Sequence, residues 1–133
     1  MKHGKLYESE YEKGFCELLT QVGWQYTHGS QLNRLTTETL YEKDLRDFLA
    51  VQYPMLSQSE YDAIVGNLRN IGEDTLYHTL RASFLLYRDG FAFNRLETDE
   101  QILVQYIDFE HPEKNIFRVT NQFEVSYGGN DKV

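Results

Sequence analysis

The stretch LLYRDGFAFN (residues 85–94) divides the sequence into two parts with different hydrophobic periodicity. Before Gly90, apolar residues recur every three or four positions, which is the spacing of amphipathic helices. After Gly90, apolar and polar residues alternate, which is typical of strands with one buried face. This change predicts an α+β fold, in which a helical part over residues 1–90 is followed by antiparallel strands over residues 91–133.

The first expected helix begins at Ser9 and ends before Gly23. Ser9 and Glu12 have the Ser-x-x-Glu spacing of a capping box, in which both side chains bond to backbone N–H groups at the helix start. Glycine commonly ends a helix because it tolerates the left-handed conformation. The apolar side chains at helical spacing are expected to face the core; they are Tyr11, Phe15, Leu18, Leu19 and Val22.

Three more helices are expected in the first part of the chain. One starts near Thr37 and is limited by Pro54, because the residue before a proline avoids the helical conformation. The next begins with a second capping box at Ser57 and closes before Gly72. The last starts around Asp74, and the side chains expected to be buried on it are Leu76, Leu80, Phe84 and Tyr87.

The strand part is predicted to open with a hairpin. Residues 91–94 and 102–107 are apolar runs joined by a polar turn. A longer strand is expected from Phe117 to Tyr127, with alternating apolar and polar faces. Gly128 to Asp131 has the composition of a turn. A chain that stops two residues later is expected to be a fragment, cut before the next strand of its sheet.

The composition indicates one globular domain over residues 1–133. Hydrophobic residues make up 41% of the chain, enough for a core without disulfides or a structural metal. The single cysteine, Cys16, is expected to be a buried, inert thiol in a reducing, cytoplasmic setting. No run approaches the ~18 apolar residues of a membrane span. The net charge of −8 argues against binding of nucleic-acid phosphates by the surface as a whole.

The sequence excludes several kinds of catalytic site. It has no G-x-S-x-G, no C-x-x-C and no glycine-rich phosphate loop, so esterase, zinc-ribbon and P-loop chemistry have no motif here. The four histidines show no i, i+4 pair that would support a metal site. Asp108, Glu110 and Glu113 form an acidic loop with oxygens that Mg²⁺ or Ca²⁺ could use. The favoured interpretation is structural, with Asp108 accepting hydrogen bonds from N–H groups of the loop.

Glu12 has a special position on the first expected helix. At 100° per residue it falls at the border of the apolar stripe, so its carboxylate can point along the seam between the helix and the sheet. From the residues alone, the favoured role is still that of the capping-box acid.

Three segments together resemble the N-terminal region of the restriction (R) subunit of type I restriction-modification enzymes. The most specific is I-D-F-x-x-P-E-x-N-x-F-x-V-x-N-Q-F-x-V at residues 107–125. Residues 12–24, E-x-x-F-x-x-x-L-x-x-x-G-W, resemble the opening helix of that family. Residues 80–91, L-x-x-x-F-x-x-x-R-D-G-F, resemble the end of its helical insert.

This resemblance implies an incomplete restriction-endonuclease-like domain of the PD-(D/E)xK type. In such a domain an acidic pair holds Mg²⁺ and a lysine assists the attacking water. No Asp or Glu lies two residues before any lysine of this chain, and the prolines precede Met55 and Glu113, so neither motif is present. The family's motif elements lie on the strands after the point where this chain ends.

For the parent protein, the resemblance implies a type I, ATP-dependent and Mg²⁺-dependent endonuclease that translocates double-stranded DNA. Its implied partners are the modification and specificity subunits, with no membrane. The fragment alone is expected to be inactive and to hold neither Mg²⁺ nor ATP. Nuclease folds of this type often place a glutamate of the first helix beside the metal-binding acids, and Glu12 matches that position, so the resemblance implies an accessory catalytic role for Glu12.

The alternative is a non-catalytic module that binds nucleic acid or protein. Helices followed by a hairpin also outline a winged-helix DNA reader. The third helix, however, carries Glu60 and Asp62 against Arg69 alone, whereas that class needs a basic recognition helix.

Overall fold

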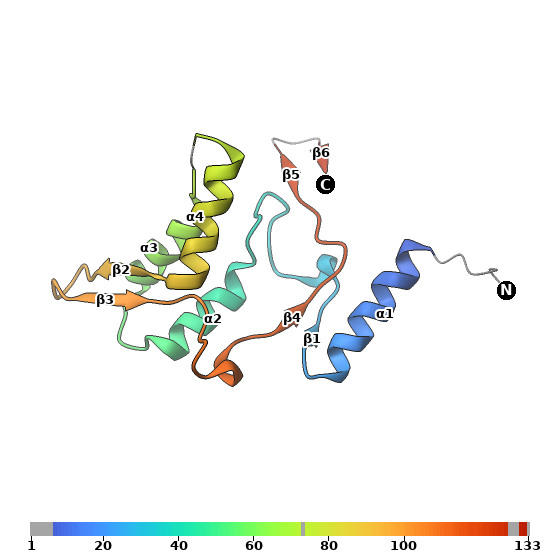
Figure 1. Cartoon of the computed structure of the whole chain (residues 1–133), viewed down its shortest axis with the longest axis horizontal. Coiled ribbons are helices and arrows are strands. Elements are labelled where there is room, and N and C mark those ends of the chain that lie inside the picture. The colour runs from blue at the N-terminus through green and yellow to red at the C-terminus, as the bar shows by residue number, and fades with distance from the viewer. Residues whose placement is uncertain (1–6, 73, 128–130, 133) are drawn as a thin grey trace. The chain divides into compact units, whose positions relative to one another are not determined.

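The computed structural model describes residues 7–72, 74–127 and 131–132 (Figure 1). Its contacts divide the chain into two compact units. The first unit contains Met1–Thr39 and Phe117–Val133, and the second unit contains Leu40–Ile116. Helices and short strands occur together, which confirms the α+β class. That the chain acts as a single domain stays a prediction.

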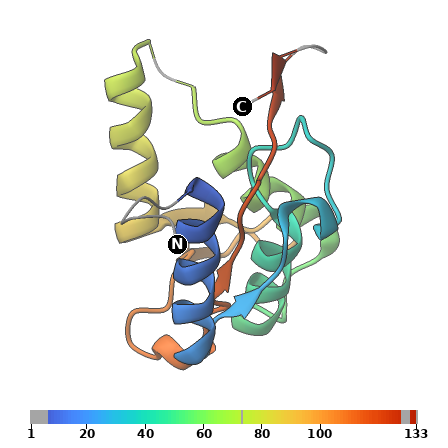
Figure 2. The ribbon, with the colours of Figure 1, turned by 90° about the vertical axis from the view of Figure 1, so that its right-hand side faces the viewer.

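The first unit combines one helix with a short parallel pair of strands. Helix α1 packs against both strands, β1 and β4, which lie side by side in Figure 2. Gln25 pairs with Arg118, and Tyr26 pairs with Val119. The expectation of only antiparallel strands was therefore wrong, because residues near the two ends of the chain pair in parallel. The elements of this unit are α1 (Glu8–Gln21), β1 (Gln25–Tyr26), the 3₁₀ helix η1 (Gly29–Gln31), β4 (Arg118–Val119), β5 (Ser126–Tyr127) and β6 (Asp131–Lys132).

The N-cap of helix α1 lies two residues before the predicted Ser9. The N-cap is Tyr7, whose backbone N–H donates to the Glu10 carboxylate at 3.1 Å. The predicted capping box of Ser9 and Glu12 was wrong, because Glu10 takes the role assigned to Glu12.

The face of α1 that is turned to the strands also differs from the prediction. Cys16 is 8% exposed, which confirms its burial, and Leu19 is half-buried. Phe15, the predicted centre of the buried stripe, is 61% exposed. Two strands of two residues each cover only the Cys16 side of the helix. The large apolar side chains left exposed on α1 are Tyr11, Phe15, Leu18 and Val22.

The expected long strand from Phe117 to Tyr127 is also wrong in its middle. Only β4 and β5 are strands, and the segment between them is irregular. Gln122 has φ 54°, in the left-handed region, which interrupts the extended backbone. Strand β5 pairs antiparallel with β6. Of the turn predicted over Gly128 to Asp131, residues 128–130 lie outside the described residues, and Asp131 begins β6.

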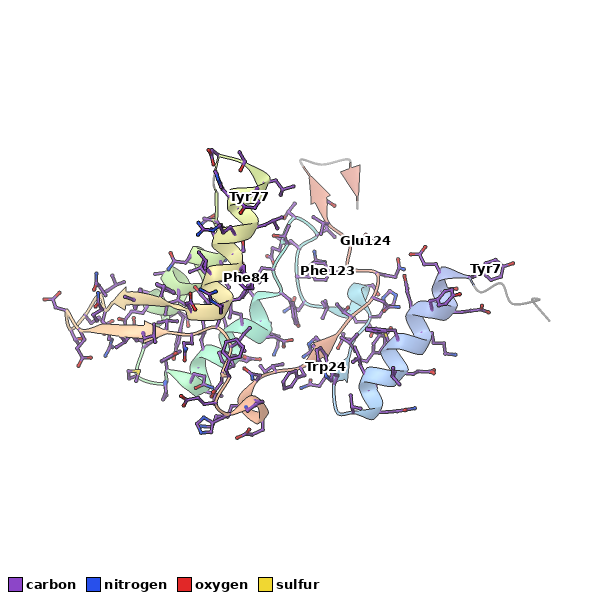
Figure 3. All side chains as sticks on the ribbon, viewed as in Figure 1. Tyr7, Trp24, Tyr77, Phe84, Phe123 and Glu124 are labelled. Atoms are coloured by element: carbon purple, nitrogen blue, oxygen red, sulfur yellow. The ribbon has the colours of Figure 1, made fainter. Side chains whose placement is uncertain are left out.

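Aromatic contacts pack the first unit. The Trp24 and Phe117 rings lie with their centroids 5.2 Å apart, and the Arg34 guanidinium lies 3.7 Å from the centre of the Phe123 ring. Figure 3 labels Trp24 and Phe123 in this region. The residues on both sides of β4 are thus packed against residues that follow α1 and η1.

The second unit contains three helices and the predicted hairpin. Strands β2 and β3 pair antiparallel, with Phe91 opposite Val104 and Asn94 opposite Gln101, which confirms the hairpin. The buried core of this unit consists of Phe48, Leu49, Leu56, Ile64, Val65, Phe93, Val104 and Tyr106. Its elements are α2 (Glu42–Gln52), α3 (Gln58–Arg69), α4 (Leu76–Asp89), β2 (Phe91–Asn94), β3 (Gln101–Val104) and the 3₁₀ helix η2 (Pro112–Lys114).

The capping box predicted at the start of α3 is confirmed. Ser57 Oγ accepts from the Glu60 N–H at 3.3 Å, and the Glu60 carboxylate accepts from the Ser57 N–H at 3.0 Å. Helix α2 ends at Gln52, before Pro54, as predicted, but it begins at Glu42 rather than near Thr37.

Helix α4 exposes the face that was expected to be buried. Leu80 is 61% exposed, and Leu76, Phe84 and Tyr87 are exposed as well. Leu86 instead packs against the core from the other side of the helix. The prediction was wrong because both sides of α4 carry apolar residues, and their period alone does not say which side meets the core. Among the described helices, none is long and apolar enough to cross a membrane.

Candidate functional site

Glu12 lies in the second turn of α1 and is bound by two side-chain amides. Gln122 Nε2 donates to Oε1 at 2.9 Å and to Oε2 at 3.0 Å. Asn121 Nδ2 donates to Oε2 at 3.3 Å. Both amides come from the segment directly after β4. The Glu12 carboxylate therefore joins α1 to the end of a strand and does not cap its own helix.

Tyr26, the second residue of β1, orients the amide of Asn121. Its hydroxyl donates to Asn121 Oδ1 at 2.7 Å. The oxygen and the NH₂ group are opposite ends of one planar amide. With its oxygen held by Tyr26, Asn121 turns its NH₂ group toward Glu12.

Gly29, in η1, supports the same segment from its backbone. Its N–H donates to the Asn121 carbonyl at 2.8 Å. A Cβ atom at Gly29 would lie 2.1 Å from the Gln122 carbonyl oxygen and 2.6 Å from its carbon. Both are backbone atoms, so rotating a side chain cannot relieve the clash. Gly29 is accordingly a position where the close approach of two chain segments requires glycine.

The Glu12 carboxylate keeps some capacity to bind a further group. Two carboxylate oxygens offer about four acceptor positions, and the amides use three of them. The remaining position is on Oε1. A pocket of about 720 Å³ in the same unit shares Tyr26 and Asn121 with this site, and its other lining residues are Lys13, Cys16, Glu17, Thr20 and Gln21.

Glu12 alone does not make a metal site. Within the residues that the structure describes, no three His, Cys, Asp or Glu side chains lie close enough to hold a metal ion. Because Mg²⁺ is generally held through more than one oxygen ligand, this part of the chain does not fit the ion by itself. What the arrangement supplies is one fixed carboxylate at the end of β4.

The acidic loop has the structural role that the sequence predicts. Asp108 accepts from the His111 N–H at 2.8 Å and from Gln52 Nε2 at 2.9 Å. The His111 N–H, followed by the Gln52 amide, holds the pKa of Asp108 below its usual value. The interpretation of Asp108 as an acceptor for loop N–H groups is confirmed. Glu110 and Glu113 are exposed beside it.

Asn115 closes the same loop. Its Oδ1 accepts from the Asp108 N–H at 2.8 Å, and its Nδ2 donates to the carbonyls of Asp108 and Pro112 at 2.9 and 3.0 Å. The motif D-F-x-x-P-E-x-N is thus a self-bonded loop, in which the Asn115 side chain holds the Asp108 backbone and the Asp108 carboxylate holds the His111 N–H.

Sequence reasoning located Glu12 but missed its partners. Asn121 and Gln122 were assigned to a regular strand, and Tyr26 and Gly29 were given no role. One signal was available: strict alternation from Phe117 places Asn121 among apolar positions. A polar residue on an apolar face indicates a specific partner or a break in the strand.

The charge of the chain is unevenly distributed between the two units. The second unit has seven Lys and Arg residues against fourteen Asp and Glu residues, whereas the first unit has six against seven. Cations of the second unit are also neutralised by neighbours, because Arg46 pairs with Asp62 and Arg69 pairs with Glu42. This surface does not favour DNA phosphates. The nearly neutral unit is the one that carries Glu12.

Comparison with known proteins places the sequence of the chain in a family. Residues 5–133 match the family described as type I restriction enzyme R protein N terminus. The chain therefore belongs to this family, as the N-terminal region of a type I restriction subunit.

A particular relative is the type I restriction enzyme HindI endonuclease subunit of Haemophilus influenzae. The two sequences are 25% identical over 130 residues, which cover 90% of this chain. The chain spans only 12% of the length of that relative. No solved structure matches the chain.

Proposed function

We propose that this chain forms the beginning of the nuclease domain of a type I restriction subunit, and that the complete protein cleaves double-stranded DNA. Family membership over residues 5–133 and the name of the relative, an endonuclease subunit, support this proposal. The observation that carries it is the placement of Glu12. A carboxylate from the first helix is fixed at the end of β4 by Asn121 and Gln122, with one acceptor position left.

In this proposal Glu12 is an accessory acid of the nuclease site. The PD-(D/E)xK domain needs an acidic pair and a lysine, and the sequence shows neither motif within residues 1–133. Those groups would come from later strands of the complete protein. The isolated chain is therefore proposed to be inactive, with Mg²⁺, ATP, DNA and the modification and specificity subunits belonging to the complete cytoplasmic enzyme.

The test uses the complete restriction subunit, assembled with its modification and specificity subunits. Linear duplex DNA cleavage is measured with Mg²⁺ and ATP for the wild type, Glu12→Gln and Glu8→Gln. Glu8 provides the matched control, because it is exposed on the same helix and loses the same charge. Removing a group that supports a metal site typically costs about tenfold to a hundredfold in activity. We expect that loss for Glu12→Gln alone, with ATP hydrolysis unchanged; cleavage by Glu12→Gln at the wild-type rate contradicts the role of Glu12.

The alternative of a non-catalytic binding module has one observation in its favour. The apolar face of α1 formed by Tyr11, Phe15, Leu18 and Val22 is exposed, and such faces often contact other proteins. Sequencing the reading frame beyond codon 133 separates the two functions. A Pro-Asp followed by a Glu-x-Lys in the next strands supports the nuclease. A stop codon at that point removes the nuclease mechanism and leaves the binding module.

A further inference from the structure

We propose that Gly29 is a positioning residue for Glu12. The absence of a side chain at Gly29 lets the backbone of Asn121 and Gln122 approach η1 closely enough for both amides to reach the Glu12 carboxylate. The importance of this arrangement for DNA cleavage rests on the function proposed above for Glu12.

The backbone of Gly29 lies directly against the backbone of Asn121 and Gln122. Gly29 donates its N–H to the Asn121 carbonyl at 2.8 Å. A Cβ atom there would be 2.1 Å from the Gln122 carbonyl oxygen, far inside van der Waals contact. Any larger residue must push the Asn121–Gln122 segment away from η1.

The side-chain amides of Asn121 and Gln122 both point toward the Glu12 carboxylate. In an extended strand, successive side chains point to opposite faces, so Asn121 and Gln122 could not both bind one carboxylate. Here the left-handed backbone of Gln122, with φ 54°, breaks the alternation. Both side chains then donate to Glu12. Displacing the turn at Gln122 would therefore move both amide donors away from the Glu12 carboxylate at the same time.

The amide oxygen of Asn121, at the end of the amide opposite the NH₂ group that binds Glu12, is also held. Tyr26 holds Asn121 Oδ1 at 2.7 Å from its hydroxyl. Tyr26 lies in β1, three residues before Gly29, so one short segment fixes both the side chain and the backbone of Asn121. The geometry points to residues 26–29 as the base on which the Glu12 site is built.

The first experiment measures the contact directly in the 133-residue chain. Nuclear magnetic resonance resolves the side-chain NH₂ signals of Asn121 and Gln122 and their nuclear Overhauser effects to the Glu12 side chain. We expect Gly29→Ala to shift both signals and to remove the effects to Glu12. Gly14→Ala is the control, since no atom lies within 4 Å of a Cβ built at Gly14 in α1. Effects to Glu12 that persist in a folded Gly29→Ala chain overturn the proposal.

The second experiment measures cleavage by the complete restriction subunit. We expect Gly29→Ala to slow DNA cleavage about tenfold to a hundredfold, as for other residues that orient the groups of an active site, without changing ATP hydrolysis. If Glu12→Gln slows cleavage and a folded Gly29→Ala does not, this inference fails and the proposed function stands. If Glu12→Gln cleaves at the wild-type rate, the proposed function fails, while the resonance experiment still decides the positioning.

Gln122→Gly covers the case in which Gly29→Ala leaves the first unit unfolded. Glycine adopts the left-handed turn without strain, so we expect the fold and the Asn121 contact to persist while one amide donor is lost. Cleavage should then fall about tenfold, because Gln122 supplies two of the three hydrogen bonds to Glu12. Where Glu12→Gln slows cleavage, unchanged cleavage by Gln122→Gly overturns the proposal, and so does loss of the Asn121 contact with the turn intact.

Discussion

Arg95 reaches the buried carboxylate of Glu60 with two of its nitrogens. Nε donates at 3.2 Å and Nη2 at 3.1 Å, and the Ser57 and Leu96 N–H groups donate to the same carboxylate. Glu60 is 0% exposed. The guanidinium of Arg95, followed by the Ser57 N–H, lowers the pKa of Glu60 from 4.5 to about 2. The second unit therefore holds an ionised acid in its core.

Glu60→Gln should lower the stability of the second unit at pH 7 and make it less dependent on pH. A carboxyl group with a lowered pKa in the folded state stabilises the fold above its unfolded pKa, and this contribution is lost as the pH falls from 4.5 to about 2. Urea midpoints measured by circular dichroism between pH 7 and pH 2 should converge for the two chains at the acid end. Parallel curves over this range would contradict the assignment.

Ile64→Ala should destabilise the second unit strongly, whereas Leu80→Ala should not. Ile64 is 0% exposed in the core, and truncating such a residue costs about 2–5 kcal/mol. Leu80 is 61% exposed on α4, where a substitution changes stability by about 0.5 kcal/mol or less. Urea unfolding of both variants measures the difference. Equal losses would mean that the apolar face of α4 is buried after all.

Gly90→Ala should destabilise the chain by more than about 1 kcal/mol, because alanine is strained at a positive φ. Gly90 ends α4 with φ 70°, and a Cβ there would lie 2.2 Å from the Val104 carbonyl oxygen. Gly72→Ala is the matched control, since the nearest atom to its Cβ is 4.0 Å away. Thermal unfolding distinguishes the two variants, and a neutral Gly90→Ala would rule out this close approach of α4 and β3.

Asn115→Ala should destabilise the loop of residues 108–115, which carries the family motif. It removes three hydrogen bonds and leaves the Asp108 N–H without its acceptor, a loss of about 1–3 kcal/mol. Glu113→Ala, on an exposed neighbour, should leave stability unchanged. Hydrogen exchange at the Asp108 amide provides the local readout, and unchanged protection in Asn115→Ala would contradict a structural role for this motif.

Local patterns in the sequence predicted the parts of the fold that local interactions determine. The Ser57–Glu60 box and the hairpin of residues 91–104 depend on residues close to one another in the chain, and both are present. The buried sides of α1 and α4 depend on which segments pack against them. Periodicity identified a stripe on each helix but not the neighbour that covers it, so both faces were assigned wrongly.

In the candidate site, too, the local feature was predicted and the contacts between distant residues were not. The position of Glu12 at the border of the apolar stripe was predicted from the rotation of 100° per residue along an α-helix. Its donors, Asn121 and Gln122, lie 109 and 110 residues away, and they meet Glu12 only because Gln122 leaves the extended conformation. A left-handed glutamine beside a glycine of another segment has no signature in a single sequence, because the two residues lie far apart in the chain.

The tryptophan packed on Phe117 makes the two units separately observable. Trp24 is the one tryptophan of the chain, and it belongs to the first unit. Its fluorescence therefore reports the environment of the unit that carries Glu12, whereas most of the helical far-ultraviolet signal comes from α2, α3 and α4 of the other unit, with a smaller part from α1. A single titration followed by both signals shows whether the units melt together, because coincident transitions are the mark of one cooperative system. Trp24 is thus an intrinsic fluorescent probe of the unit that carries Glu12.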